Sequence, residues 1–110
     1  NTLSLHDALP IFSATQKWGL NSQMLTGAST IAASLQAGKH VLAAVGPSRF
    51  INAPYTHEIV LHGYDNGKTY VRDPFNAANN GWYGIDYIHS LKSTDPMDTK
   101  LGSPFFSIFA

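Results

Sequence analysis

The sequence predicts an α+β domain in which an antiparallel sheet is flanked by helices. Two helix-type segments alternate with a first strand in the N-terminal half, and a series of short apolar runs that favour strands follows them. Two of these runs are joined by Asp65-Asn66-Gly67, which is typical of a tight hairpin turn. The order helix, strand, helix and then several strands indicates the α+β class.

Two helices and a strand are expected before residue 38. Residues 12–18 fit the last turns of a helix that Gly19 ends. A second helix begins at a side-chain cap, either Thr26 or Ser29, and runs to Ala37. Between the two helices, residues 21–25 form a short strand.

The rest of the chain reads mainly as strands. A central strand is expected at 39–45, the two strands of a hairpin at 57–64 and 68–73, and a last apolar strand at 104–109. Residues 48–56, 75–81 and 94–102 are rich in turn-forming residues and read as loops. A short helix at 82–91 places Ile85, Ile88 and Leu91 inward.

Composition narrows the possible functions. Of the 110 residues, 44% are hydrophobic and 13% are charged, so the chain can bury a core. The net charge is zero, which leaves no basic surface of the kind that binds nucleic acid or an anionic membrane. The longest apolar runs, such as 41–45, are far too short for a membrane span. The chain contains no cysteine, and therefore no disulfide, thiolate ligand or thiol nucleophile.

The first residues are unusual in another way. Back-translation of residues 2–11 matches one reading frame of a common sequencing adapter, so we interpret residues 1–11 as an adapter-derived artefact. On this interpretation the domain sequence is 12–110. A signal peptide of the native gene could not be seen here.

The most informative stretch is 57–74, because a histidine opens the first hairpin strand and an aspartate closes the second. Side chains of a strand alternate between faces, so the loop length decides whether His57 and Asp73 meet. A two-residue loop, Asn66-Gly67, would put Asp73 opposite Val60 and away from His57. A three-residue loop with a left-handed Gly67 would put Asp73 opposite Ile59, diagonal to His57 and within reach. We predict the three-residue loop.

Such a pair has a definite chemistry. A carboxylate that fixes the tautomer of an imidazole makes it a general base for a thiol or hydroxyl nucleophile. None of the serines lies in a nucleophile-elbow sequence. The pair could equally be a hydrogen bond at the strand ends with no catalytic role.

Other residues are candidates for a substrate groove or a metal site. Tyr55 and Trp82 could line a substrate groove, although such aromatic residues more often bury apolar area. His57 and His62 lie five residues apart on one strand and therefore on opposite faces, so no metal site is predicted, and no cofactor is implied. Asn76, Asn79 and Asn80 are expected only to form turns.

Three segments together resemble a known family. They are Leu35-Gln36-Ala37-Gly38-Lys39-His40-Val41, then Thr56-His57-Glu58-Ile59-Val60-Leu61-His62-Gly63-Tyr64-Asp65, then Thr69-Tyr70-Val71-Arg72-Asp73-Pro74. In spacing, turn and Asp-Pro ending they resemble the double-glycine-leader (bacteriocin-processing) cysteine peptidases and their peptidase-like relatives. Three positions depart from the family pattern: Thr56, Glu58 and His40 stand where glycine, an aromatic residue and proline are usual.

The resemblance implies a papain-like fold, of which residues 12–110 would be the C-terminal part. It also implies peptide-bond hydrolysis on a peptide or protein substrate, with His57 as the catalytic histidine and Asp73 as its orienting residue. The cysteine and the oxyanion-hole glutamine would lie upstream, so the chain as given is expected to be inactive. The family is bacterial, and its relatives are secreted or at the cell surface. The alternative is a non-catalytic module that binds peptide or cell wall on the same fold.

Overall fold

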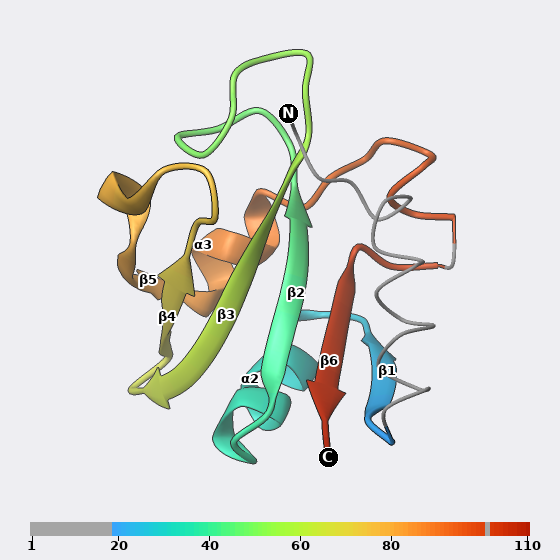
Figure 1. Cartoon of the computed structure of the whole chain (residues 1–110), viewed down its shortest axis with the longest axis vertical. Helices are drawn as coiled ribbons and strands as arrows, with labels where there is room; N and C mark the ends of the chain where they lie inside the picture. Colours follow the sequence, from blue (N-terminus) through green and yellow to red (C-terminus); the bar gives the residue numbers. More distant parts are fainter. Residues whose placement is uncertain (1–18, 101) are drawn as a thin grey trace.

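The computed structural model describes residues 19–100 and 102–110, and their centre is a six-stranded antiparallel sheet (Figure 1). The strand order is β1-β6-β2-β3-β4-β5. The strands are β1 (Asn21–Leu25), β2 (His40–Val45), β3 (His57–Asp65), β4 (Lys68–Arg72), β5 (Gly81–Gly84) and β6 (Phe105–Phe109). With the helices α2 (Ala28–Gln36) and α3 (Ile85–Ser90) and the short 3-10 helix η1 (Ala77–Asn79), this confirms the predicted α+β class.

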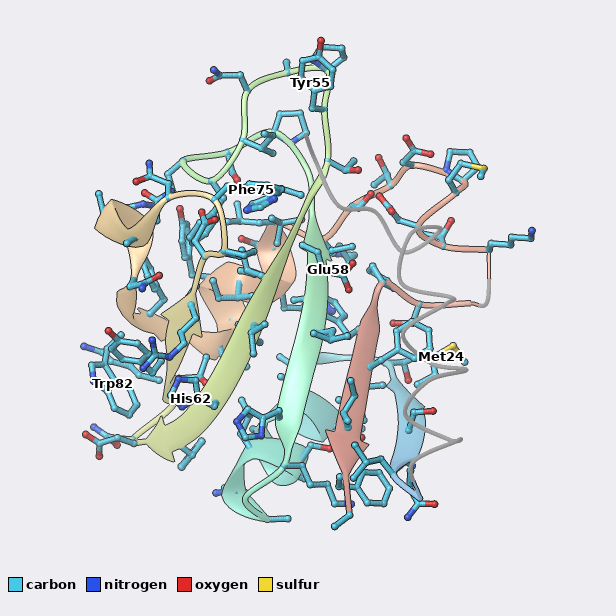
Figure 2. The ribbon with its side chains drawn as sticks, in the orientation of Figure 1. Met24, Tyr55, Glu58, His62, Phe75 and Trp82 are labelled. Atoms are coloured by element: carbon cyan, nitrogen blue, oxygen red, sulfur yellow. The ribbon has the colours of Figure 1, made fainter. Side chains whose placement is uncertain are left out.

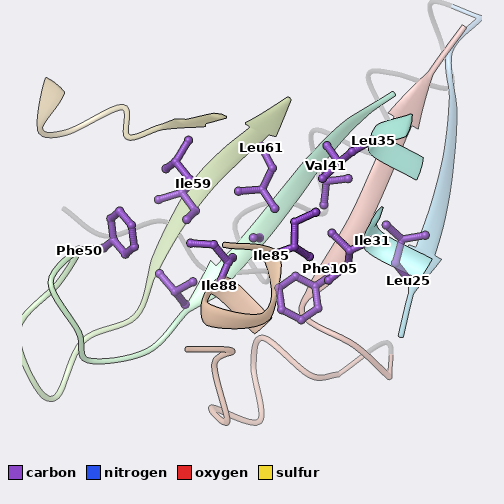
Figure 3. Packing of buried hydrophobic residues seen from close by; sticks show 13 residues of the cluster. Leu25, Ile31, Leu35, Val41, Phe50, Ile59, Leu61, Ile85, Ile88 and Phe105 are labelled. Carbon is purple, nitrogen blue, oxygen red and sulfur yellow. The ribbon is translucent and has the colours of Figure 1, made fainter. Parts of the chain in front are cut away.

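Both α-helices cover the same face of the sheet, and the core lies between them and the strands (Figure 3). Alternate residues of β2, β3 and β6 point into this core, as the two-residue period of a strand requires. The fully buried apolar side chains include Ile31, Val41, Val45, Ile59, Leu61, Val71, Ile88 and Phe105. Neither helix has the length and apolarity that a membrane crossing needs, and this holds for the whole described part of the chain.

The start of α2 differs from the prediction. Its N-cap is Gly27, with a φ of 86°, and no side chain caps the helix. The hydroxyl of Thr30 instead donates back to the Gly27 carbonyl at 2.9 Å. Neither Thr26 nor Ser29 therefore has the predicted role, because the left-handed turn at glycine brings the chain into the helix without a side-chain cap. The predicted helix at 12–18 and the interpreted artefact at 1–11 lie outside the described residues.

The hairpin of β3 and β4 closes with a two-residue turn, so the predicted three-residue loop is wrong. Asp65 pairs with Lys68 across Asn66 and Gly67, whose φ angles are both positive, 49° and 81°. Left-handed residues at both positions are typical of the type I′ turn. The register then shifts between His62 and Asp65, where Gly63 also has a positive φ of 76°.

Because of this β-bulge, Asp73 lies on the same face of the sheet as His57, as the sequence predicted. Beyond the bulge, His62 pairs with Tyr70, Leu61 with Val71 and Val60 with Arg72. One further step puts Asp73 opposite Ile59, on the same face as His57. The extra residue is therefore in the strand rather than in the turn, and it has the same effect on the sidedness of the strand.

The segment 82–91 is not all helix. Its first residues belong to β5, which pairs with β4 so that Trp82 lies opposite Tyr70 and Tyr83 opposite Thr69. The helix α3 starts only at Ile85, and Ile85 and Ile88 are buried as predicted. Strand β5 is four residues long and has no apolar alternation of its own, so it depends on the exposed edge of β4 for its hydrogen bonds.

Candidate active site

The sheet register brings His57 and Asp73 together at one end of the β3–β4 hairpin. His57 Nε2 and Asp73 Oδ1 are 2.7 Å apart, and both side chains are 1% exposed. His57 is also anchored on its other side, since β2 places Val45 opposite it. Two residues far apart in the sequence thus form a buried imidazole–carboxylate pair.

The carboxylate of Asp73 is held by a set of donors in addition to the histidine. Its Oδ1 accepts the backbone N–H of Phe75 at 2.9 Å and that of Asn76 at 3.2 Å. Its Oδ2 accepts the side-chain amide of Asn79 at 3.0 Å. The backbone N–H of Asp73 donates to Asn80 Oδ1 at 2.7 Å. The loop after β4 therefore wraps back over the aspartate and satisfies it.

These contacts keep Asp73 ionised. Burial acts to raise the pKa of this carboxyl, because it disfavours the charged form. The hydrogen bonds from Asn79, His57 and Phe75 outweigh burial, and the pKa of Asp73 lies below its ordinary value. An ionised Asp73 can only accept hydrogen bonds, so His57 donates from Nε2.

In the neutral ring, this donation assigns the two ring nitrogens different roles. When Nε2 of a neutral imidazole carries the proton, Nδ1 presents a lone pair. In His57 this Nδ1 is buried and has no hydrogen-bond partner among residues 19–100 and 102–110. Buried polar atoms without a partner are rare in proteins, and they are often found where a ligand or a reacting group belongs.

The surroundings of the ring are partly aromatic. The Phe75 ring is tilted against His57 with its centroid 5.1 Å away, although Phe75 is 54% exposed (Figure 2). A cavity of about 520 Å³ opens beside the start of β3 and is lined on one side by Pro54 and Thr56 and on the other by Leu91 and Lys92. Space for a ligand therefore exists next to the strand end that carries His57.

The two groove candidates behave differently. Tyr55 is 58% exposed in the loop just before β3, at the same end of the sheet as His57 (Figure 2). Trp82 is 50% exposed, but it packs edge-on against Tyr70, with ring centroids 5.8 Å apart, on the face opposite Asp73. Tyr55 thus remains a candidate for a substrate contact, whereas Trp82 is not brought to the pair.

Sequence reasoning missed two partners of the pair. Asn79 was expected only to form a turn, and it donates to the buried carboxylate instead. Phe75 was not singled out, although it follows the Asp-Pro step and contacts both members of the pair. The available signal was the position of this polar loop, which directly follows a strand that ends in an aspartate.

Comparison with known proteins identifies the family and the fold. The model of the Peptidase_C39 like family matches residues 1–93. Among solved structures, one from Bacillus anthracis, provisionally described as a C39-like peptidase, is similar with a TM-score of 0.62 and 18% identity. The alignment covers 96% of this chain and 58% of that one, so the chain spans little more than half of its relative.

No curated protein matches the chain significantly. At 18% identity the structural similarity concerns the fold, which is that of the C39-like peptidase. The family match extends over most of the sequence and includes both members of the buried pair. The chain therefore belongs to the Peptidase_C39-like family.

Proposed function

We propose that His57 and Asp73 are the general-base part of a cysteine peptidase site, and that the thiol comes from a polypeptide segment outside these 110 residues. The observation that carries this proposal is the buried Nδ1 of His57, which has no partner in the described part of the chain while Nε2 is hydrogen-bonded to Asp73. A general base needs this arrangement, with one ring nitrogen fixed and the other free for the proton of the nucleophile.

The reaction would be hydrolysis of a peptide bond through an acyl-enzyme. His57 Nδ1 takes the thiol proton, and the thiolate attacks the carbonyl carbon of the substrate. The imidazolium then protonates the leaving amine, and a water molecule activated by the same nitrogen releases the acid and the free thiol. Asp73 keeps the ring orientation and stabilises the imidazolium while it exists.

The chain by itself supplies no nucleophile, since it has no cysteine. Its buried pair is nevertheless assembled, because every group that holds it lies between β2 and the loop after β4. We therefore expect the 110-residue chain to lack peptidase activity while it retains the His57–Asp73 geometry.

The decisive experiment starts from the gene rather than from this chain. The locus is read again without the adapter-like codons and extended upstream, and a longer protein with a cysteine preceded by glutamine is expressed. In that protein His57→Ala lowers kcat for peptide hydrolysis by about 10²- to 10⁴-fold, the usual contribution of a general base. The matched control is His89→Gln, a histidine on α3 that contacts Phe105 and not the pair.

The same protein offers a second readout. If His57 activates the thiol, the pH profile of alkylation by iodoacetamide moves to higher pH in His57→Ala and stays in place in His89→Gln. An extended gene without a cysteine, or a folded cysteine-bearing protein whose alkylation does not depend on His57, refutes the peptidase proposal. The alternative function, a peptide- or cell-wall-binding module on the same fold, would then be preferred.

A further inference from the structure

The sheet face opposite the helices carries a second group of side chains that the proposed active site does not use. We call it the outer cluster, and it consists of His40, His62, Tyr70, Arg72 and Trp82. Toward β6 this face is buried, since Ala44 and Phe106 are buried there. Within the outer cluster, His40 and Arg72 are exposed and Trp82 is 50% exposed. Figure 2 shows His62 and Trp82 close together, well away from Phe75.

The outer cluster is ordered by ring contacts across four strands. His62 stands between His40, with ring centroids 5.6 Å apart, and Tyr70, at 5.2 Å. Tyr70 in turn contacts Trp82 edge-on at 5.8 Å. Each contact joins neighbouring strands, from β2 to β5, so the surface is a continuous strip of flat side chains.

Arg72 is fixed within this strip. Its Nε donates to His62 Nε2 at 3.3 Å, and its guanidinium carbon lies 5.7 Å from the Tyr70 ring centroid. An arginine held at Nε and beside a ring has lost much of its freedom before any ligand arrives, which reduces the entropy cost of binding.

The charge of Arg72 is not neutralised. The ion pair between His57 and Asp73 is the only one among residues 19–100 and 102–110, so Arg72 has no carboxylate partner there. A guanidinium stays protonated at any pH the protein experiences, and its terminal nitrogens are suited to bidentate contact with a carboxylate. An arginine that is oriented and has no carboxylate partner among the described residues is therefore suited to bind an anion.

The neighbours of Arg72 indicate which anion. Burial, the charge of Arg72 and the nearby His40 lower the pKa of His62, so at neutral pH the strip has one fixed positive charge at this point. One charge suits a carboxylate better than a doubly charged phosphate. Tyr70 and Trp82 add apolar area on which the residue next to the carboxylate can pack.

We propose that the outer cluster binds an acidic peptide segment, with a carboxylate on Arg72 and an adjacent apolar side chain on Tyr70 and Trp82. The site does not require the thiol of the proposed peptidase reaction, and it lies on the sheet face opposite Asp73. It can therefore be tested on this chain, and its failure would leave the peptidase proposal unaffected.

The test uses the 110-residue chain and a capped pentapeptide with one glutamate between two phenylalanines. Its glutamine counterpart and inorganic phosphate serve as the comparison ligands, and calorimetry and NMR of His62 as the readouts. We expect saturable binding of the glutamate peptide, and binding about tenfold weaker for the glutamine peptide and for Arg72→Lys, which keeps the charge but loses the planar donor pair. The control Lys68→Gln, which removes a positive charge from the same strand, leaves the affinity within about twofold.

Linkage gives a second readout. A bound carboxylate favours the protonated imidazole, so the glutamate peptide raises the pKa of His62 and the glutamine peptide does not. The charged and titratable groups that face His62 are His40 from β2 and Tyr70 and Arg72 from β4. A structural role for Arg72 alone would give no peptide-dependent change.

Three results would overturn the proposal. The first is the absence of saturable binding to the folded chain. The second is weaker binding of the peptide to Lys68→Gln with unchanged binding to Arg72→Lys, which would reveal general charge attraction. The third is tighter binding of inorganic phosphate than of the peptide, with the same shifts at His62, which would make the cluster a small-anion site.

Discussion

Arg72 and Asp73 are neighbours in the sequence, yet they lie in opposite environments. Asp73 is 5% exposed, and its carboxylate accepts hydrogen bonds from a histidine, an asparagine and two backbone amides. Arg72 is exposed on the other face and has a neutral imidazole and a phenol ring beside it. The pleat of one strand thus separates a buried, fully hydrogen-bonded carboxylate from a surface guanidinium that has no carboxylate partner among the described residues.

This difference shows that the face of the sheet on which a charged side chain lies determines whether the charge is buried and hydrogen-bonded or open to a ligand. The anion is enclosed by a loop that follows it, and this enclosure fixes His57. The Arg72 guanidinium is oriented by His62 but exposed to solvent, so a ligand can reach it. Four changes test this contrast, and they are ordered from the largest expected effect to the smallest.

The largest effect is expected for Asp73→Asn. The amide turns an NH₂ group toward the Asn79 amide, so two donors face each other in a buried site. We expect the free energy of unfolding to fall by about 2–3 kcal/mol, the scale of lost hydrogen bonds to a buried charge. Urea denaturation measures it, with Asp65→Asn in the exposed turn as the control, where the change stays within about 0.5 kcal/mol. Equal effects at both positions would remove the contrast.

The same carboxylate should make the protein sensitive to acid. Its pKa in the folded state is below the ordinary value of 3.8, so the unfolded chain binds the proton more readily. The stability it contributes is fully present above pH 3.8 and is lost as the pH falls through the lower folded-state pKa. The difference in the free energy of unfolding between the native protein and Asp73→Asn therefore becomes smaller as the pH falls below 3.8. A gap that stays constant in urea titrations from pH 6 to pH 3 would contradict this linkage.

An intermediate effect is expected for Gly63→Ala in the bulge. The φ of Gly63 is 76°, where an L-residue costs about 1–2 kcal/mol. The control is Gly84→Ala, because the φ of Gly84 is −61° and an added Cβ would meet Tyr87 Cβ only at 3.9 Å. If Gly63→Ala cost no more stability than Gly84→Ala, the bulge could not be what fixes the register of Asp73.

The smallest effect on stability is expected for Arg72→Gln, within about 0.5 kcal/mol, because the side chain is at the surface. The substitution instead changes the pKa of His62 through the loss of a positive charge. Removal of the guanidinium charge lets the pKa of His62 rise toward its ordinary value of 6.5, although burial and His40 continue to lower it. An NMR pH titration of the His62 ring measures the shift, and an unchanged titration would show that Arg72 does not act on this imidazole.

Local patterns in the sequence were enough for most of the elements. Apolar runs predicted the strands of the hairpin, the central strand and the last strand, and a glycine past the second helix marked its end. The fold class followed from their order. His57 and Asp73 also stood out, because each occupies a strand end where a hairpin brings residues together.

Other features depend on contacts that a local pattern does not encode. Strand β5 depends on the edge of β4, so the local pattern predicted its residues 82–84 as helix and Gly81 as loop. The turn residues 65–67 predicted the wrong loop length. A single glycine in a strand is compatible with several conformations, so Gly63 did not by itself predict the bulge. The partner role of Asn79 likewise required the loop to fold back over β4.

The sequence by itself determined an α+β chain with an imidazole at the start and a carboxylate at the finish of one hairpin segment, since strand propensity and turn residues are local properties. Only the tertiary structure decided that the two side chains meet and that loop amides stabilise the ionised aspartate. It also decided that, within the part of the chain that the structure describes, Nδ1 of His57 has no partner and Arg72 faces outward without an acidic one. These outcomes depend on register and burial, which are set when distant segments pack against one another.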